Sequence, residues 1–120
     1  MLESATALKT RAAVFAALGD ETRLSMLTKI GEGPPQSISR LTAGTRMSRQ
    51  AVTKHLRVLE DVGVVRSIRS GRESLFEIVP KPIDELRSFL SEMSSQWDVA
   101  LARLKSVSYT HLTLPTIYSV

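Results

Sequence analysis

The chain has 120 residues, of which 42% are hydrophobic and 23% are charged, and its formal net charge is +4. This length fits one small globular domain, and the apolar fraction excludes a chain that is disordered throughout. Since the sequence contains no cysteine, a disulfide scaffold, a thiol nucleophile and a thiolate metal site are also excluded.

The N-terminal quarter of the sequence predicts two helices. Apolar side chains follow helical spacing over residues 5–18, and Gly19 ends that run. Asp20 is a suitable N-cap for a second helix that reaches Ile30. We interpret the alanine-rich stretch before Gly19 as a helix and not as a signal peptide, and no stretch approaches the roughly 20 apolar residues of a membrane span. We therefore expect a cytoplasmic protein without a membrane partner.

Two further helices are predicted in the middle of the chain. Ser39 is the expected N-cap of a short helix that Gly44 closes. Ser48 is expected to cap a longer helix over residues 49–62, with Gly63 just beyond its last turn.

The spacing of apolar residues no longer follows a helix after this fourth helix. Residues 64–69 and 74–79 are β-prone, and the Ser70-Gly71 dipeptide between them is a turn signal, so a hairpin is predicted. Pro82 lies in the first turn of a long final helix. The predicted fold is mainly α with a small β-hairpin, in the order ααααββα.

The predicted helix over residues 49–62 has one polar and one apolar face. At about 100° per residue its polar arc holds Arg49, Gln50, Thr53, Lys54, Arg57, Glu60 and Asp61. Arg pairs well with guanine and Gln with adenine, and Thr can contact a base edge or a phosphate. A polar arc is more often an ordinary solvated face, and Arg57 has an alternative role as an ion-pair partner of Glu60 or Asp61. His55 lies in the apolar arc, where we expect a structural histidine.

Positive charge is concentrated in the same part of the chain. Residues 37–72 contain eight basic and two acidic side chains, a net charge of +6, whereas the rest of the chain has eight basic and ten acidic side chains. Nucleic-acid affinity depends largely on neutralising phosphates, so this distribution is typical of a DNA-binding surface. Arg66, Arg69 and Arg72 on the hairpin have a simpler alternative role as protection of a sheet edge. The order of short helix, turn, capped basic helix and basic hairpin favours DNA binding.

Three segments in that order resemble the ArsR/SmtB family of bacterial and archaeal repressors. They are residues 17–24 (ALGDETRL), residues 47–59 (MSRQAVTKHLRVL) and residues 63–65 (GVV), followed by a similar hairpin tip at residues 69–73. The resemblance covers about residues 8–105 and implies a winged helix-turn-helix homodimer that binds a double-stranded operator. From the polar arc and the resemblance together, the predicted DNA-binding residues are Ser48, Arg49, Gln50, Thr53, Lys54, Arg57, Arg69 and Arg72.

The sequence departs from the metal sensors of this family. Those carry a Cys-x-Cys element near the third helix, or Asp and His ligands on the last helix. Here cysteine is absent, and the last helix has Asp84 but Leu86 where a His is needed. His55 alone cannot complete a site that needs three or four ligands. The chain therefore resembles the metal-free branch, and we predict no metal and no cofactor; the sequence does not name the effector.

The final predicted helix carries a long apolar stripe that needs a partner surface. The stripe runs through Ile83, Leu86, Phe89, Leu90, Met93, Trp97, Ala100, Leu101 and Leu104. It can pack on the first helix of its own chain, line a small-molecule pocket, or pair with a second copy. We expect a dimer interface with Trp97 as its hot spot. The predicted interface residues are Leu8, Phe15, Leu86, Phe89, Leu90, Met93, Trp97 and Leu101.

The composition changes near the end of the sequence. Residues 107–120 are rich in Ser and Thr, and residues 107–116 resemble the translation of a sequencing adapter. We predict one domain over residues 1–106 followed by an artefact tail; the alternative is a native β-prone tail.

Catalytic groupings are missing from the sequence. It has no Ser-His-acid set, no paired carboxylates on one helical face and no phosphate-binding glycine loop, so we predict no enzyme. We expect a sequence-specific transcriptional regulator, by family default a repressor, that binds an inverted-repeat operator as a homodimer. The alternative is a winged-helix module that binds protein and not DNA.

Overall fold

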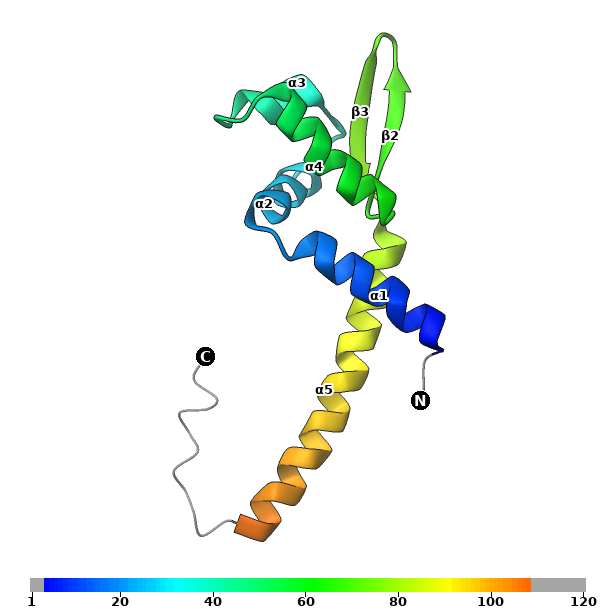
Figure 1. Cartoon of the computed structure of the whole chain (residues 1–120), viewed down its shortest axis with the longest axis vertical. Helices are drawn as coiled ribbons and strands as arrows, with labels where there is room; N and C mark the ends of the chain where they lie inside the picture. The colour runs from blue at the N-terminus through cyan, green and yellow to red at the C-terminus, as the bar shows by residue number, and fades with distance from the viewer. Residues whose placement is uncertain (1–3, 109–120) are drawn as a thin grey trace. The chain divides into compact units, whose positions relative to one another are not determined.

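A computed structural model describes residues 4–108 of the chain. The elements in chain order are α1 (Ala5–Leu18), α2 (Glu21–Gly31), β1 (Gln36–Ser37), α3 (Ile38–Ala43), α4 (Arg49–Asp61), β2 (Val65–Ser70), β3 (Glu73–Ile78) and α5 (Pro80–Ser108) (Figure 1). The described residues divide into two compact units, 4–85 and 86–108. The predicted class, mainly α with a winged hairpin, is confirmed, with β1 as an additional strand.

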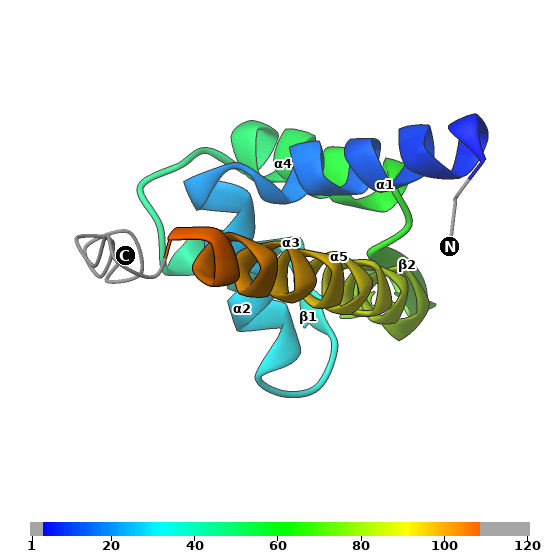
Figure 2. The same ribbon diagram turned by 90° about the horizontal axis from the view of Figure 1, so that it is seen from below.

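The first two helices begin at side-chain caps. The Oγ atom of Ser4 accepts a hydrogen bond from the backbone N–H of Ala7 at 3.1 Å, and Oδ2 of Asp20 accepts one from the backbone N–H of Arg23 at 2.9 Å. These bonds satisfy N–H groups that have no partner inside the helix. The predicted start of α2 is therefore confirmed. Figure 2 shows α1 beside α4, which it contacts.

The third helix is capped by Ser37, and the prediction of Ser39 was wrong. Ser37 is the last residue of β1, where it pairs with Leu75, and its Oγ atom accepts a hydrogen bond from the backbone N–H of Arg40 at 3.1 Å. The strand leads directly into the helix, so the earlier serine has the extended backbone that an N-cap needs. Two residues of strand leave no alternating pattern, which is why β1 was not predicted.

The fourth helix and the hairpin follow the prediction closely. The Oγ atom of Ser48 accepts a hydrogen bond from the backbone N–H of Ala51 at 3.1 Å, and Gly63 follows the helix with a φ of 82°. Gly71, with a φ of 63°, turns the chain between β2 and β3. The antiparallel pairs run from Val65 opposite Ile78 to Ser70 opposite Glu73, and the sheet order is β1-β3-β2.

The core of residues 4–85 lies among α2, α3, α4 and β2. Its fully buried side chains are Ile30, Leu41, Val52, Leu56, Leu59, Val64 and Val65. The apolar arc of α4 supplies three of them and so fixes which side of that helix faces solvent. Val58, at the edge of the buried face of α4, is 37% exposed.

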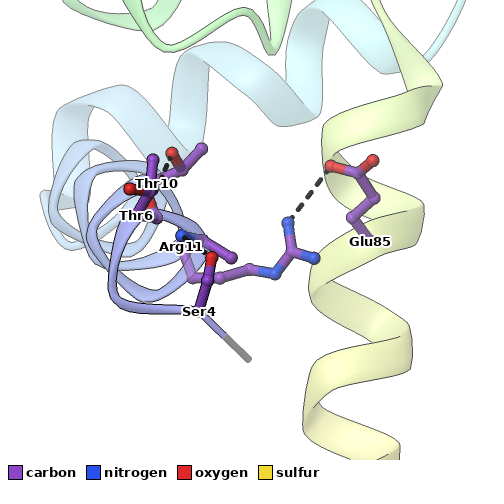
Figure 3. Close-up of polar contacts among 6 residues, drawn as sticks. Ser4, Thr6, Thr10, Arg11 and Glu85 are labelled. Carbon is purple, nitrogen blue, oxygen red and sulfur yellow. Dashed lines mark hydrogen bonds and ion pairs between the residues drawn. The ribbon is translucent and has the colours of Figure 1, made fainter. Parts of the chain in front are cut away.

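The last helix begins at Pro80 and keeps Pro82 in its first turn, as predicted. Arg11 of α1 extends toward Glu85 of α5, and their Nη1 and Oε1 atoms are 3.2 Å apart (Figure 3). The helix continues through Ser108, two residues past the predicted domain boundary, and the rest of the predicted tail, 109–120, lies outside the described residues. No helix within residues 4–108 has both the length and the apolar character needed to cross a bilayer.

Candidate nucleic-acid interface

The exposed side of α4 carries most of the predicted DNA-binding residues. Arg49, Gln50, Lys54 and Arg57 are exposed and Thr53 is half-buried, while the opposite face of the helix is buried in the core. The two strands of the hairpin contact α3 and α4, the helices that flank the turn at residues 44–48: β2 packs against α4, and β3 packs against α3. The structure thus brings the predicted helix and the predicted wing into one unit.

The N-terminal end of α4 has an uncompensated positive dipole. The first turn of the helix contains no acidic side chain, and Ser48 occupies only the backbone N–H of Ala51. The free N–H groups at this end and the aligned peptide dipoles favour an anion there. This end of the helix suits a phosphate group.

Arg49, the first residue of α4, is held by a residue of α3. Its Nη1 atom donates a hydrogen bond to Oγ of Ser39 at 2.6 Å. The bond crosses the turn between the two helices and leaves the Nε and Nη2 donors of the guanidinium uncommitted to Ser39.

Thr53 uses its hydroxyl within the helix. Oγ1 of Thr53 donates to the backbone carbonyl of Arg49 at 2.7 Å. Since the hydroxyl proton is committed to the backbone, Thr53 can offer a partner an acceptor oxygen and a methyl group but no hydrogen-bond donor. The contact of Thr53 with DNA stays a prediction.

Three other side chains of the polar arc have no internal partner in the described part of the chain. Gln50 and Lys54 form no hydrogen bond there, and Arg57 forms no ion pair with Glu60 or Asp61. Glu60 instead accepts a hydrogen bond from Oγ of Ser67 at 3.2 Å, which links α4 to β2. The alternative role of Arg57 as an intrahelical ion-pair partner is therefore not observed.

The three arginines of the hairpin differ in their surroundings. Arg66 forms an ion pair with Glu77 on the neighbouring strand, with 2.5 Å between Nε and Oε2. Arg69 donates to the carbonyl of Gly71 at 3.3 Å, and exposed Arg72 forms no ion pair within residues 4–108. Arg66 therefore fits the role of a sheet-edge residue, while Arg69 and Arg72 place two uncompensated charges at the tip.

Comparison with known proteins identifies the family. Residues 7–68 match the Helix-turn-helix domain family. The chain is 36% identical to YuzN, an HTH-type transcriptional regulator of Bacillus subtilis (strain 168). The aligned 80 residues cover 62% of this chain and 87% of YuzN. An ArsR-like transcriptional regulator from Rhodococcus sp. RHA1 superposes with a TM-score of 0.76 and 36% identity, over 86% of this chain and 96% of that one. This chain belongs to the ArsR family.

A third comparison concerns the fold alone. The homodimeric winged helix-turn-helix DNA-binding domain of a possible ArsR-family regulator from Mycobacterium bovis has a TM-score of 0.63 at 21% identity, over 80% of this chain and 92% of that one. In the chain described here, α3 and α4 form the helix-turn-helix, with α4 as its second helix, and β2 and β3 form the wing.

Arg23, near the start of α2, forms contacts that the sequence patterns did not predict. Nε of Arg23 donates to the carbonyl of Ala17 at 2.6 Å, and its Nη1 lies 3.5 Å from Nδ1 of half-buried His55. The backbone N–H of Arg23 lowers the pKa of the Asp20 carboxyl below its ordinary value of 3.8. The only signal in the sequence was its place in the ALGDETRL segment.

The predicted interface residues of this ArsR-family regulator differ in exposure. On α1, Leu8 is 47% exposed and Phe15 is half-buried. On α5, Leu86 is 5% and Trp97 is 61% exposed. The remaining members are half-buried or exposed: Phe89, Met93, Leu90 and Leu101. Leu86 therefore has little surface for a partner, while Trp97 has the most.

The acidic and histidine side chains of the described residues do not cluster into a metal site. Residues 4–108 contain no group of three or more His, Cys, Asp or Glu side chains that could hold a metal ion. Asp84 and His55, the candidates considered from the sequence, do not form part of such a group within that range.

Proposed function

We propose that this regulator binds an inverted-repeat operator as a homodimer and represses transcription without responding to a metal ion. The observation that carries the proposal is the exposed side of α4, where Gln50, Lys54 and Arg57 have no internal partner in the described residues. Because Lys54 and Arg57 form no ion pair in the described residues, their charges are available to the phosphates of a duplex.

The side chains of α4 suit two kinds of contact with a duplex. The major groove is about 12 Å wide and admits an α-helix. Arg49 and Gln50, in the first turn, have the chemistry for guanine and adenine, and Thr53 offers a methyl group to thymine. Lys54 and Arg57 lie farther along the same face and supply charge for phosphates. The positive N-terminal end of α4, at Ser48, suits a phosphate of the DNA backbone.

The wing extends the contact surface. Arg69 and Arg72 lie at the hairpin tip and carry charges that no acidic side chain in residues 4–108 neutralises through an ion pair. We propose that they contact phosphates or the minor groove beside the bases that α4 reads. Such contacts raise affinity for any duplex without adding much sequence preference.

Pairing of two copies would set the form of the operator. Leu8 on α1 and Leu90, Trp97 and Leu101 on α5 are exposed apolar side chains that suit a partner subunit. The related domain from Mycobacterium bovis is homodimeric. A two-fold axis places two reading helices in successive major grooves, about 34 Å apart, so the half-sites form an inverted repeat.

Duplex binding separates this proposal from the alternative of a protein-binding winged helix. The probe is a fluorescent duplex recovered from a random library by the full-length protein, with a scrambled duplex as comparison. We expect preference for the recovered duplex and a steep decrease of affinity with salt. Equal binding to the two duplexes would refute sequence-specific recognition, while salt-insensitive or absent binding would refute DNA binding and favour the protein-binding alternative.

Two further measurements test repression and metal independence. A reporter gene carrying the recovered operator in its promoter should be less active when the regulator is present; higher activity would indicate an activator. Addition of Zn²⁺ or of a chelator should leave operator affinity unchanged, because no ligand cluster exists within residues 4–108. A change of affinity with either reagent would contradict metal independence.

A further inference from the structure

Ser39 has a hydroxyl that helix capping does not use. Ser37 caps α3, so Ser39, the second residue of that helix, is not needed as an N-cap. Its Oγ atom accepts the hydrogen bond from Nη1 of Arg49 at 2.6 Å. Both side chains are exposed, and this short, charge-assisted bond joins the two helices of the helix-turn-helix.

Arg49 is poorly placed for the stability of its own helix. A cation in the first turn opposes the helix dipole, and no acidic side chain occupies that turn of α4. The residue therefore fits a role in binding an external acceptor better than a role in folding. An exposed arginine has many rotamers, however, and loses that freedom when it binds.

The contact with Ser39 reduces this cost. It holds the guanidinium in one arrangement before DNA is present, and it occupies one donor of Nη1. The Nε and Nη2 donors on the opposite edge remain for a paired contact with O6 and N7 of guanine. Preorganisation of this kind strengthens a specific contact without adding any new one.

We propose that Ser39 is a specificity-determining positioning residue, which orients Arg49 for a paired contact with guanine in each half-site. This inference rests on the proposed function, since it concerns the base preference of the same recognition surface. Ser39 itself contacts no base. Its effect acts entirely through the side chain of Arg49.

The test is a base-preference profile, obtained by measuring relative affinities for duplexes in which each operator position is varied in turn. We expect Ser39→Ala to weaken the preference for guanine at one position per half-site by about three-fold to ten-fold, with the other positions and the affinity for scrambled duplex unchanged. Ser39→Thr keeps the hydroxyl and should retain the profile. Ser25→Ala, at an exposed serine of α2, is the matched control.

A double-variant cycle shows whether the effect passes through Arg49. In an Arg49→Ala background, Ser39→Ala should cause no further change in the profile. An unchanged profile for Ser39→Ala beside a changed one for Arg49→Ala would overturn the proposal. So would a uniform weakening at all positions together with a lower melting temperature, since that is the result of a purely structural role. If the wild-type protein shows no base preference at all, the proposed function itself fails, and this inference fails with it.

Discussion

Nη1 of Arg23 lies 3.5 Å from Nδ1 of His55, which joins the start of α2 to the middle of α4. The same guanidinium donates to the carbonyls of Ala17 and Ala16 at the end of α1, at 2.6 Å and 3.4 Å. One side chain therefore ties three helices together behind the face that we propose reads DNA. Hydrogen bonds from a charged donor to the last carbonyls of a helix also complement the helix dipole.

Arg23→Ala should lower the free energy of unfolding by roughly 1.5–3 kcal/mol, the usual range for hydrogen bonds that involve a charged group. Urea denaturation followed by circular dichroism measures the change. Arg46→Ala, which removes an exposed arginine from the turn before α4, is the control and should fall within about 0.5 kcal/mol of the wild type. Equal stability of the two variants would show that the Arg23 contacts contribute nothing.

Asp20 should contribute to acid sensitivity. Because its pKa is lowered in the folded state, the carboxylate stabilises the fold above its unfolded pKa, and this contribution is lost as the pH falls through the folded value. Wild-type protein should lose more stability than Asp20→Asn between about pH 5 and about pH 2. Glu21→Gln removes the neighbouring exposed carboxylate and keeps the cap hydrogen bond. Parallel pH profiles for wild type and Asp20→Asn would contradict this prediction.

Substitutions at Thr53 should separate its methyl group from its hydroxyl. Thr53→Val keeps a methyl group and removes a hydroxyl that is bonded to the helix, so operator affinity should change by less than about three-fold. Thr53→Ser keeps the hydroxyl and should weaken binding by about five-fold or more if the methyl contacts thymine. Anisotropy titrations with the recovered operator measure both. The opposite order of the two effects would indicate a hydrogen-bonding role.

Wing arginines should differ in their effect on salt dependence. Arg72→Ala should weaken binding to operator and scrambled duplex alike, and should reduce the salt slope by about 0.9 for each phosphate that the arginine neutralises. Arg66→Ala should have a smaller effect, because Glu77 already pairs with that charge. Titrations at several salt concentrations give the slopes. An effect confined to the operator would mean that Arg72 reads bases.

Trp97→Ala should weaken dimerisation and, through it, operator affinity. Truncation of an aromatic hot spot typically costs about 2 kcal/mol or more, which is a factor of about 30 in the dimer dissociation constant. Sedimentation equilibrium measures the constant. Val99→Ala is the matched control, since Val99 is 57% exposed but lies off the predicted stripe. A dimer as tight as the wild type would place the interface elsewhere.

Much of this protein was predictable from short-range patterns in its sequence. Asp20 and Ser48 begin helices because a local side chain satisfies local N–H groups, and Gly63 ends one because its backbone requires a positive φ. The polar arc of α4 was visible because helical periodicity separates it from a buried face. These features depend on neighbours within a few residues, so no knowledge of the fold was needed.

Interactions between residues distant in the chain were decided only by the tertiary structure. Pairing of Ser37 with Leu75 moved the start of α3 away from Ser39 and released that hydroxyl for Arg49. Cross-strand pairing likewise separated Arg66 from the other two arginines of the wing. Local propensity treats such residues as equivalent, because what distinguishes them is a partner that only folding brings within hydrogen-bonding distance.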